Sequence, residues 1–302
     1  MATRVPLPEG LDTGAFRVSD AIALGVGRSR LDNRDLSAPF WGIRSAAPST
    51  DTLLSLCAAL SQRMPGPAFF SHLTAAQLLQ IPLPAHLERA FPIHVGIAPP
   101  KRAMDAKNVV GHRLSLQPGD LVTWNGMRLT SPSRTWLDLA TVLTPPDLVA
   151  AGDFLVRRRH GVVSVADLQD AAARFGGRRG RTTFRAALPL LRDGAESRRE
   201  SLLRVIIVQA GLPEPLCNLN VYAPDGRFIA RPDLLYPRYK VIVEYHGDQH
   251  RTDLRQWRRD IQRNGDLEDH GWKIVQFTMA DLDTPAALIA RIRTRLRASG
   301  WR

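Results

Sequence analysis

PDLLYPRYKVIVEYH, residues 232–246, contains two apolar segments separated by the turn-forming residues 237–240. Residues 227–235 and 241–246 are therefore expected to form neighbouring strands of a hairpin. A helix is predicted before them over residues 196–210, because apolar side chains recur there at helical spacing and a Gly-Leu-Pro sequence ends the pattern.

The expected hairpin brings three titratable side chains to one face. A turn at residues 237–240 pairs Tyr236 with Val241, and the same register places Asp233 opposite Glu244. Cross-strand partners lie roughly 5 Å apart at Cβ. His246 shares the face of Glu244, because side chains alternate along a strand.

Two carboxylates this close repel each other, and a divalent cation is the simplest compensation. Oxygen ligands of this type suit Mg²⁺ or Mn²⁺, which would be held by Asp233 and Glu244. His246 would position or deprotonate an attacking water. The alternative is a hairpin whose acidic side chains lie on a solvated face, which the alternation of polar and apolar residues over 241–246 also allows.

The last hundred residues resemble the PD-(D/E)XK nuclease superfamily, most closely its very-short-patch-repair-like branch. The matching pieces, in order, are a helix with Glu200, Pro232-Asp233, Val243-Glu244-Tyr245-His246-Gly247-Asp248-Gln249-His250, Trp257-Arg258-Arg259-Asp260-Ile261-Gln262-Arg263 and Gly271-Trp272. The resemblance implies a restriction-endonuclease-like α/β core over residues 195–302 that cleaves DNA.

The resemblance also implies roles for individual residues. Glu200 would be the helix acid, and Asp233 and Glu244 the metal ligands. His246 occupies the place of the superfamily's lysine, which leaves the general base open between His246 and His250. Arg263 would either form an ion pair on its own helix or reach a phosphate.

The N-terminal residues 1–64 are expected to form a DNA-binding domain. Two short helices separated by a Gly-Val-Gly break, followed by a short strand, are the order of a winged helix-turn-helix. The segment of about residues 14–64 resembles the winged-helix domain of abortive-infection type IV antitoxins. The residues that carry the resemblance are Val18-Ser19-Asp20-Ala21, Gly25-Val26, the basic second helix and Trp41-Gly42-Ile43-Arg44. In such a domain Arg28, Arg30 and Arg34 would face DNA; the alternative is a solvated basic face.

Residues 65–194 are expected to form a middle α+β region with a basic linker. Strands are predicted over 91–95 and 121–124, the second closed by an Asn-Gly turn, and a helix over 130–140. His72, Arg134 and Asp138 could form a site, although structural roles are favoured. The basic loop that contains Arg178, Arg179 and Arg181 would follow a phosphate backbone.

Composition and charge agree with a multidomain α/β (α+β) protein that binds nucleic acid. The chain has 302 residues, with 41 Lys and Arg against 29 Asp and Glu. A basic excess of this size favours DNA as partner. Two distant cysteines exclude a disulfide framework. The absence of a long apolar run or a secretory signal predicts a cytoplasmic protein without a membrane anchor.

The sequence therefore predicts a Mg²⁺-dependent (or Mn²⁺-dependent) endodeoxyribonuclease with an N-terminal DNA-binding module. One alternative is an antitoxin-like transcriptional regulator with a degenerate, non-cleaving nuclease fold. Another is a structural or partner-binding module of a defence system. Whether the chain forms a homodimer or binds a defence-system partner protein stays open.

Overall fold

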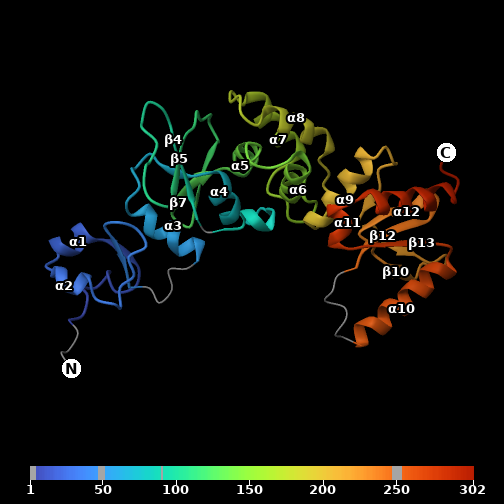
Figure 1. Cartoon of the computed structure of the whole chain (residues 1–302), viewed down its shortest axis with the longest axis horizontal. Helices are drawn as coiled ribbons and strands as arrows, with labels where there is room; N and C mark the ends of the chain where they lie inside the picture. The colour runs from blue at the N-terminus through green and yellow to red at the C-terminus, as the bar shows by residue number, and fades with distance from the viewer. Residues whose placement is uncertain (1–4, 47–51, 90, 247–253) are drawn as a thin grey trace. The chain divides into compact units, whose positions relative to one another are not determined.

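The computed structural model describes residues 5–46, 52–89, 91–246 and 254–302, with the side chains of 254–260 left out. The chain forms two compact units, Met1–Val142 with Asp170–Arg181, and Leu143–Gln169 with Thr182–Arg302. Twelve α-helices and several sheets lie within the described residues (Figure 1). The fold is therefore mixed α/β, and its division into three domains stays a prediction.

The N-terminal part of the first unit is a small β-α-α-β arrangement. Strands β1 (Ala15–Arg17) and β2 (Ile43–Ser45) pair antiparallel around helices α1 (Val18–Ala23) and α2 (Arg28–Leu31). Both predicted helices are present, but the second, expected over residues 29–36, ends at Leu31. Gly25 has a φ of 84° between them. Ile43 of β2 belongs to the same hydrophobic cluster as buried residues of the middle of the chain.

A five-stranded mixed sheet with strand order β5-β4-β3-β7-β6 forms the centre of the first unit. Parallel pairs join β3 to β7 and β4 to β5, whereas β3–β4 and β6–β7 are antiparallel. The strands are β3 (Phe69–Phe70), β4 (Ile93–Ile97), β5 (Val109–Arg113), β6 (Leu121–Trp124) and β7 (Met127–Thr130), and the helices are α3 (Leu53–Ser61), α4 (His72–Leu78) and α5 (Pro132–Leu139).

Local signals in this region are confirmed. Asn125 and Gly126 have φ values of 46° and 73°, as a tight turn between β6 and β7 requires. The side chain of Ser131 caps α5 by accepting a hydrogen bond from the Arg134 N–H. The strand predicted over 91–95 is present as β4, two residues further along the chain.

The second unit is built on a four-stranded sheet with strand order β13-β12-β11-β8. Its strands are β8 (Leu216–Cys217), β11 (Leu234–Tyr236), β12 (Val241–Tyr245) and β13 (Lys273–Phe277); β9 (Val221–Tyr222) and β10 (Phe228–Ala230) form a separate hairpin. Its helices are α6 (Pro145–Val156), α9 (Arg198–Gln209), α10 (Leu254–Asp269), α11 (Met279–Asp283) and α12 (Ala286–Arg297). Helices α7 (Val165–Arg174) and α8 (Arg181–Ala187) lie where the chain passes between the two units.

The two faces of this sheet are covered differently. Val241 and Val243 pack into a core that contains residues of α9 and α12, whereas Ile242 packs with Leu267 of α10 and residues of the β9–β10 hairpin. Glu244 shares the face of Ile242, because side chains alternate along β12. The acid of β12 therefore points to the side of the sheet that α10 covers.

The single strand expected over residues 227–235 is wrong. Its two ends lie in different sheets, because β10 pairs with β9 and β11 pairs with β12 and β8. Pro232 lies between the two strands and has no N–H to donate to a ladder. The break places Asp233 directly before β11, at the edge of the sheet.

No helix in the described ranges is both long enough and apolar enough to cross a membrane.

Candidate functional site

The hairpin register predicted from the turn is confirmed. Tyr236 pairs with Val241, and Leu234 with Val243. Continuing this register by one residue places Asp233 opposite Glu244. The Tyr245 N–H donates a 2.7 Å hydrogen bond to Oδ2 of Asp233, which fixes this carboxylate against the end of β12. Asp233 and Glu244 are therefore cross-strand neighbours at one end of the β11–β12 pair.

The surroundings of Asp233 disfavour its negative charge. Burial raises the pKa of Asp233 above its ordinary value, and the Glu200 carboxylate raises it further. The Tyr245 N–H and the guanidinium groups of Arg263 and Arg199 act in the opposite direction without cancelling the rise. Asp233 thus lies in a place where an added positive charge would be stabilising.

Two arginines flank the acid pair. Arg263, from α10, forms a 3.1 Å ion pair with the carboxylate of Glu244, whose side chain is only 10% exposed. Arg199, from α9, lies over the ring of Tyr245 with its guanidinium carbon 4.3 Å from the ring centroid. The site therefore combines a buried acid, Glu244, and a half-buried one, Asp233, with two arginines that reach the surface, a combination that can bind a phosphate next to a cation.

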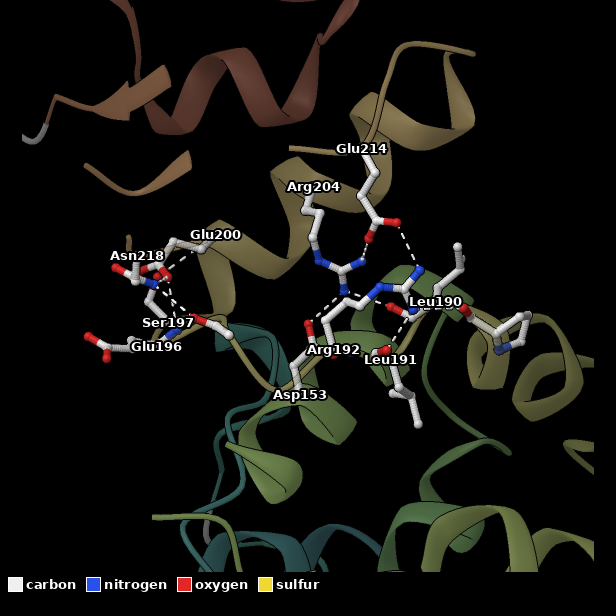
Figure 2. A network of polar contacts seen from close by, with 12 residues as sticks. Asp153, Leu190, Leu191, Arg192, Glu196, Ser197, Glu200, Arg204, Glu214 and Asn218 are labelled. Carbon is white, nitrogen blue, oxygen red and sulfur yellow. Dashed lines mark hydrogen bonds and ion pairs between the residues drawn. The ribbon is translucent and has the colours of Figure 1, made fainter. Parts of the chain in front are cut away.

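Glu200 is held at the beginning of α9 (Figure 2). Its Oε2 accepts hydrogen bonds from the Glu196 N–H at 2.8 Å and from the Asn218 amide at 2.5 Å. Ser197 caps the same helix by accepting from the Glu200 N–H. The cap and the amide together orient the acid that raises the pKa of Asp233.

Arg204, one turn further along α9, does not contact Glu200. Its guanidinium reaches Asp153 of α6 at 2.8 Å and Glu214 at 2.9 Å, and it donates to the carbonyl of Leu190 (Figure 2). Both Arg204 and Asp153 are 1% exposed. Glu200 and Arg204 therefore have separate roles, one toward the site and one toward the interior of the unit.

An open pocket of about 430 Å³ lies beside Asn218, the amide partner of Glu200. It is lined by Arg157, Arg158, Arg159, His160, Asp193, Gly194, Glu196, Cys217, Asn218, Asn220 and Arg231. Two of its arginines are paired within the lining, Arg158 with Asp193 and Arg231 with Glu196. The other arginines of the lining, Arg157 and Arg159, are the basic groups that this pocket offers to an anion.

The acids of this site offer oxygen ligands to a metal ion. Asp233, Glu244 and Glu200 supply carboxylate oxygens, the ligand type that Mg²⁺ prefers. Among the described residues, however, the one group of three or more His, Cys, Asp or Glu side chains with ligand atoms within 4.8 Å of one another is His72, His94 and His112. The three acids do not form such a group, and the hairpin register makes Asp233 and Glu244 the cross-strand pair.

The two histidines predicted as general bases differ in what the structure shows. His246 is exposed at the end of β12, where its N–H donates a 2.7 Å hydrogen bond to the Phe277 carbonyl. It follows Glu244 by two residues, the spacing on which the predicted shared face rests. His250 lies outside the described residues, so its place in the site stays a prediction.

The arginines predicted to face DNA are not equivalent. Arg30 is only 9% exposed and forms a two-bond ion pair with Asp35, so its expected exposure toward DNA is wrong. The physical reason is that its guanidinium closes the core of the β1–β2 region by also donating to the Val5 carbonyl. Arg28 and Arg34 are exposed.

The basic loop before α8 is exposed at each of its predicted residues. Arg178, Arg179 and Arg181 lie at the surface, and Arg181 donates a 3.3 Å hydrogen bond to the Phe175 carbonyl. Gly180 has a φ of 76°, and an added Cβ would lie 2.8 Å from the backbone of Ala140. The loop is therefore anchored tightly against α5 while its side chains face outward.

Comparisons with known proteins give relatives without a stated activity. No protein-family model matches the chain. The uncharacterized proteins MT2308 and Rv2248, from the CDC 1551 / Oshkosh and ATCC 25618 / H37Rv strains of Mycobacterium tuberculosis, are each 30% identical to it over 173 residues. The match covers 57% of this chain and 63% of each relative, so the chain spans less than two thirds of their length.

Proposed function

We propose that the second unit is a metal-dependent endonuclease domain that hydrolyses DNA phosphodiester bonds. The observation that carries the proposal is the acid pair formed by the half-buried Asp233 opposite the buried Glu244, in which burial and the Glu200 carboxylate raise the pKa of Asp233. A divalent cation would relieve this unfavourable charge, and Mg²⁺ or Mn²⁺ suits the oxygen donors.

Each residue of the site has its own role in this proposal. Asp233 and Glu244 would hold the metal, which when bound polarises a phosphoryl oxygen and activates water. Arg263 and Arg199 would bind the phosphate oxygens, which guanidinium groups do bidentately. His246 would accept a proton from the attacking water. Glu200 would keep Asn218 and the beginning of α9 in place.

DNA would reach the site along basic surface of the same unit. The pocket that contains Arg157, Arg158 and Arg159 adjoins Asn218, which hydrogen-bonds Glu200. Arginines in such a groove neutralise backbone phosphates and make binding salt-dependent without reading the sequence. Arg28 and Arg34, together with the loop of Arg178, would add contacts in the first unit.

Plasmid nicking in Mg²⁺ or Mn²⁺ tests the proposal. Asp233→Asn and Glu244→Gln are expected to lower the rate of nicking by about 100-fold or more, because each removes a charged ligand from a metal that supplies several kcal/mol of transition-state stabilisation. Asp269→Asn and Glu268→Gln change exposed acids at the end of α10 and serve as matched controls. Nicking at the wild-type rate by Asp233→Asn would contradict the assignment.

One observation favours the second candidate, an antitoxin-like transcriptional regulator with a non-cleaving fold. The ion pair between Arg263 and Glu244 already compensates one of the two acids without a metal. This candidate predicts sequence-specific DNA binding in a mobility-shift assay, no nicking in any divalent metal, and the same DNA affinity for wild type and Asp233→Asn.

A further inference from the structure

Three histidines gather in the first unit, far from the acid site in sequence. His72 begins α4, His94 lies in β4 and His112 lies in β5 (the elements are labelled in Figure 1). One ring nitrogen of each lies within 4.8 Å of those of the other two. His72 and His94 are buried, and His112 is half-buried.

The fold brings His72 of helix α4 against His94 and His112 of the sheet that this helix contacts. Parallel pairing places His94 beside Val110 and His112 beside Gly96, so the two histidines are diagonal neighbours on one face of the sheet. The beginning of α4 is tied to β4, because the Ser71 N–H donates to the His94 carbonyl at 3.1 Å. A second bond runs from the His94 N–H to Oγ1 of Thr74 at 2.8 Å.

His72 is fixed from its own side as well. Its φ is 48°, a left-handed conformation that is uncommon for a residue with a Cβ. Its Nδ1 lies 3.1 Å from Oγ of Ser71. A hydrogen bond of this kind orients the ring, as the partner oxygens of metal-binding histidines do, and makes Nε2 the nitrogen that would bind a metal.

The three rings interact with one another. Nδ1 of His94 and Nε2 of His112 lie 2.9 Å apart in a hydrogen bond. The ring of His112 stacks on that of His72 with centroids 3.8 Å apart and an angle of 17°. Buried imidazoles packed this closely favour their neutral forms, and burial lowers the pKa of His94 to about 4. Neutral imidazole is the form that binds transition metals.

We propose that His72, His94 and His112 form a binding site for a Zn²⁺-type transition-metal ion, with a fourth position open to water or an exogenous ligand. Imidazole nitrogens suit Zn²⁺, which binds them at roughly 2.0–2.1 Å in tetrahedral geometry. Ligand nitrogens of such a site are about 3.4 Å apart. The 2.9 Å contact between His94 and His112 would open slightly, and the stacked rings would rotate about their soft terminal torsions.

The surroundings tolerate an added cation. Arg134 is close enough to His72 to disfavour a second positive charge there, but it is paired with Asp120 at 2.7 Å and with Asp138 at 3.0 Å. Its charge is therefore offset by two carboxylates. The half-buried ring of His112 provides the side from which an ion and its water can enter. Three protein ligands and an open position are the arrangement of a reactive zinc centre rather than of a closed structural one.

Zinc binding by the untagged full-length protein tests this proposal. After removal of metals with a chelator, Zn²⁺ is titrated by calorimetry in a large excess of Mg²⁺, which occupies the acid site of the second unit. One equivalent of Zn²⁺ is expected per chain. His94→Ala and His112→Gln are expected to weaken this binding by at least about 100-fold, because each removes one of three ligands.

Two controls separate the ligands from general effects. His86→Ala changes an exposed histidine of the same unit and should bind Zn²⁺ like wild type. Asp233→Asn should also bind normally, so that failure of the nuclease proposal leaves this test intact. Circular dichroism establishes that each variant folds. If His94→Ala does not fold, the larger replacement in His112→Gln still tests the loss of a ligand.

A spectroscopic readout completes the test. Co²⁺ bound to wild type should give the visible d–d bands of a tetrahedral complex, and His94→Ala should abolish them. The proposal is overturned if wild type binds no Zn²⁺ in the presence of Mg²⁺. It is equally overturned if the folded His94 and His112 variants keep the affinity of wild type, or if His86→Ala loses it.

Discussion

At the scale of single residues, charged groups in this protein are buried together with their partners. Arg134 and Asp138, one turn apart on α5, are 4% and 2% exposed and form a 3.0 Å ion pair. Among the described residues, Oδ2 of Asp138 has no hydrogen-bond partner. The sequence favours structural roles for both residues, and their ion pair is consistent with that role.

The buried carboxyl of Asp138 predicts a pH dependence. Burial raises its pKa to about 6, against the opposing effect of Arg134. The folded state therefore holds this proton more tightly than the unfolded state does. Its contribution to the free energy of unfolding is full below the unfolded pKa of about 4 and is lost as the pH rises through about 6.

Asp138→Asn keeps the side chain neutral and removes this dependence. Relative to wild type, the variant is expected to gain stability as the pH is raised from 4 to 7. Chemical denaturation of both proteins at four pH values measures the difference in their free energies of unfolding. A difference that stays constant over this range would show that Asp138 is ionised throughout in the folded state.

At the scale of elements, the beginning of α9 connects helix stability to the site. Ser197 caps the helix, and Glu200 in the first turn accepts from the Glu196 N–H. The helix is predictable from its apolar spacing and from the Gly-Leu-Pro sequence that ends it. The partner of Glu200, Asn218, is not predictable, because it is brought in by the loop after β8.

Ser197→Ala tests this connection. Loss of the cap is expected to lower the free energy of unfolding by about 1 kcal/mol. Under the proposed function it should also lower the nicking rate, because Glu200 loses its fixed place. Ser197→Asp keeps an oxygen acceptor at the cap and is the matched control. Equal stability of wild type and Ser197→Ala would exclude a capping role.

The hairpin of β11 and β12 shows how far local rules extend. Its register follows from the turn at residues 237–240 alone, and Lys240 adopts the left-handed conformation, with a φ of 50°, that closes it. The extent of the preceding strand does not follow. Whether residues 227–233 continue one sheet or enter a second depends on β9 and β8, which lie elsewhere in the sequence.

At the scale of the whole molecule, the chain passes between its two units more than once. Residues 143–169 belong to the second unit although they precede a segment of the first. Arg204 of α9 is bound by Asp153 of α6, and both are fully buried (Figure 2). The second unit therefore needs α6 as well as residues 195–302.

Two fragments test this requirement. Residues 182–302 lack Asp153 but keep Glu214 and the Leu190 carbonyl as partners of Arg204, so the lost bond to Asp153 is expected to cost about 1.5–3 kcal/mol. This is a substantial part of the stability of an ordinary domain. Residues 143–302 keep the pair and should unfold at a clearly higher denaturant concentration.

Arg204→Met in the shorter fragment provides the control, because it removes the charge that has lost Asp153 and should recover part of the stability. Equal unfolding midpoints for the two unmodified fragments would contradict a structural role for α6.

The sequence by itself determined what depends on neighbours along the chain: the helix that carries Glu200, the turn that places Asp233 opposite Glu244, and the Asn125-Gly126 turn. Tertiary structure decided the burial of Arg30, the pairing of Arg263 with Glu244 and the meeting of His72, His94 and His112. Backbone geometry and side-chain periodicity act over a few residues, whereas these contacts join segments whose proximity depends on how sheets and helices pack.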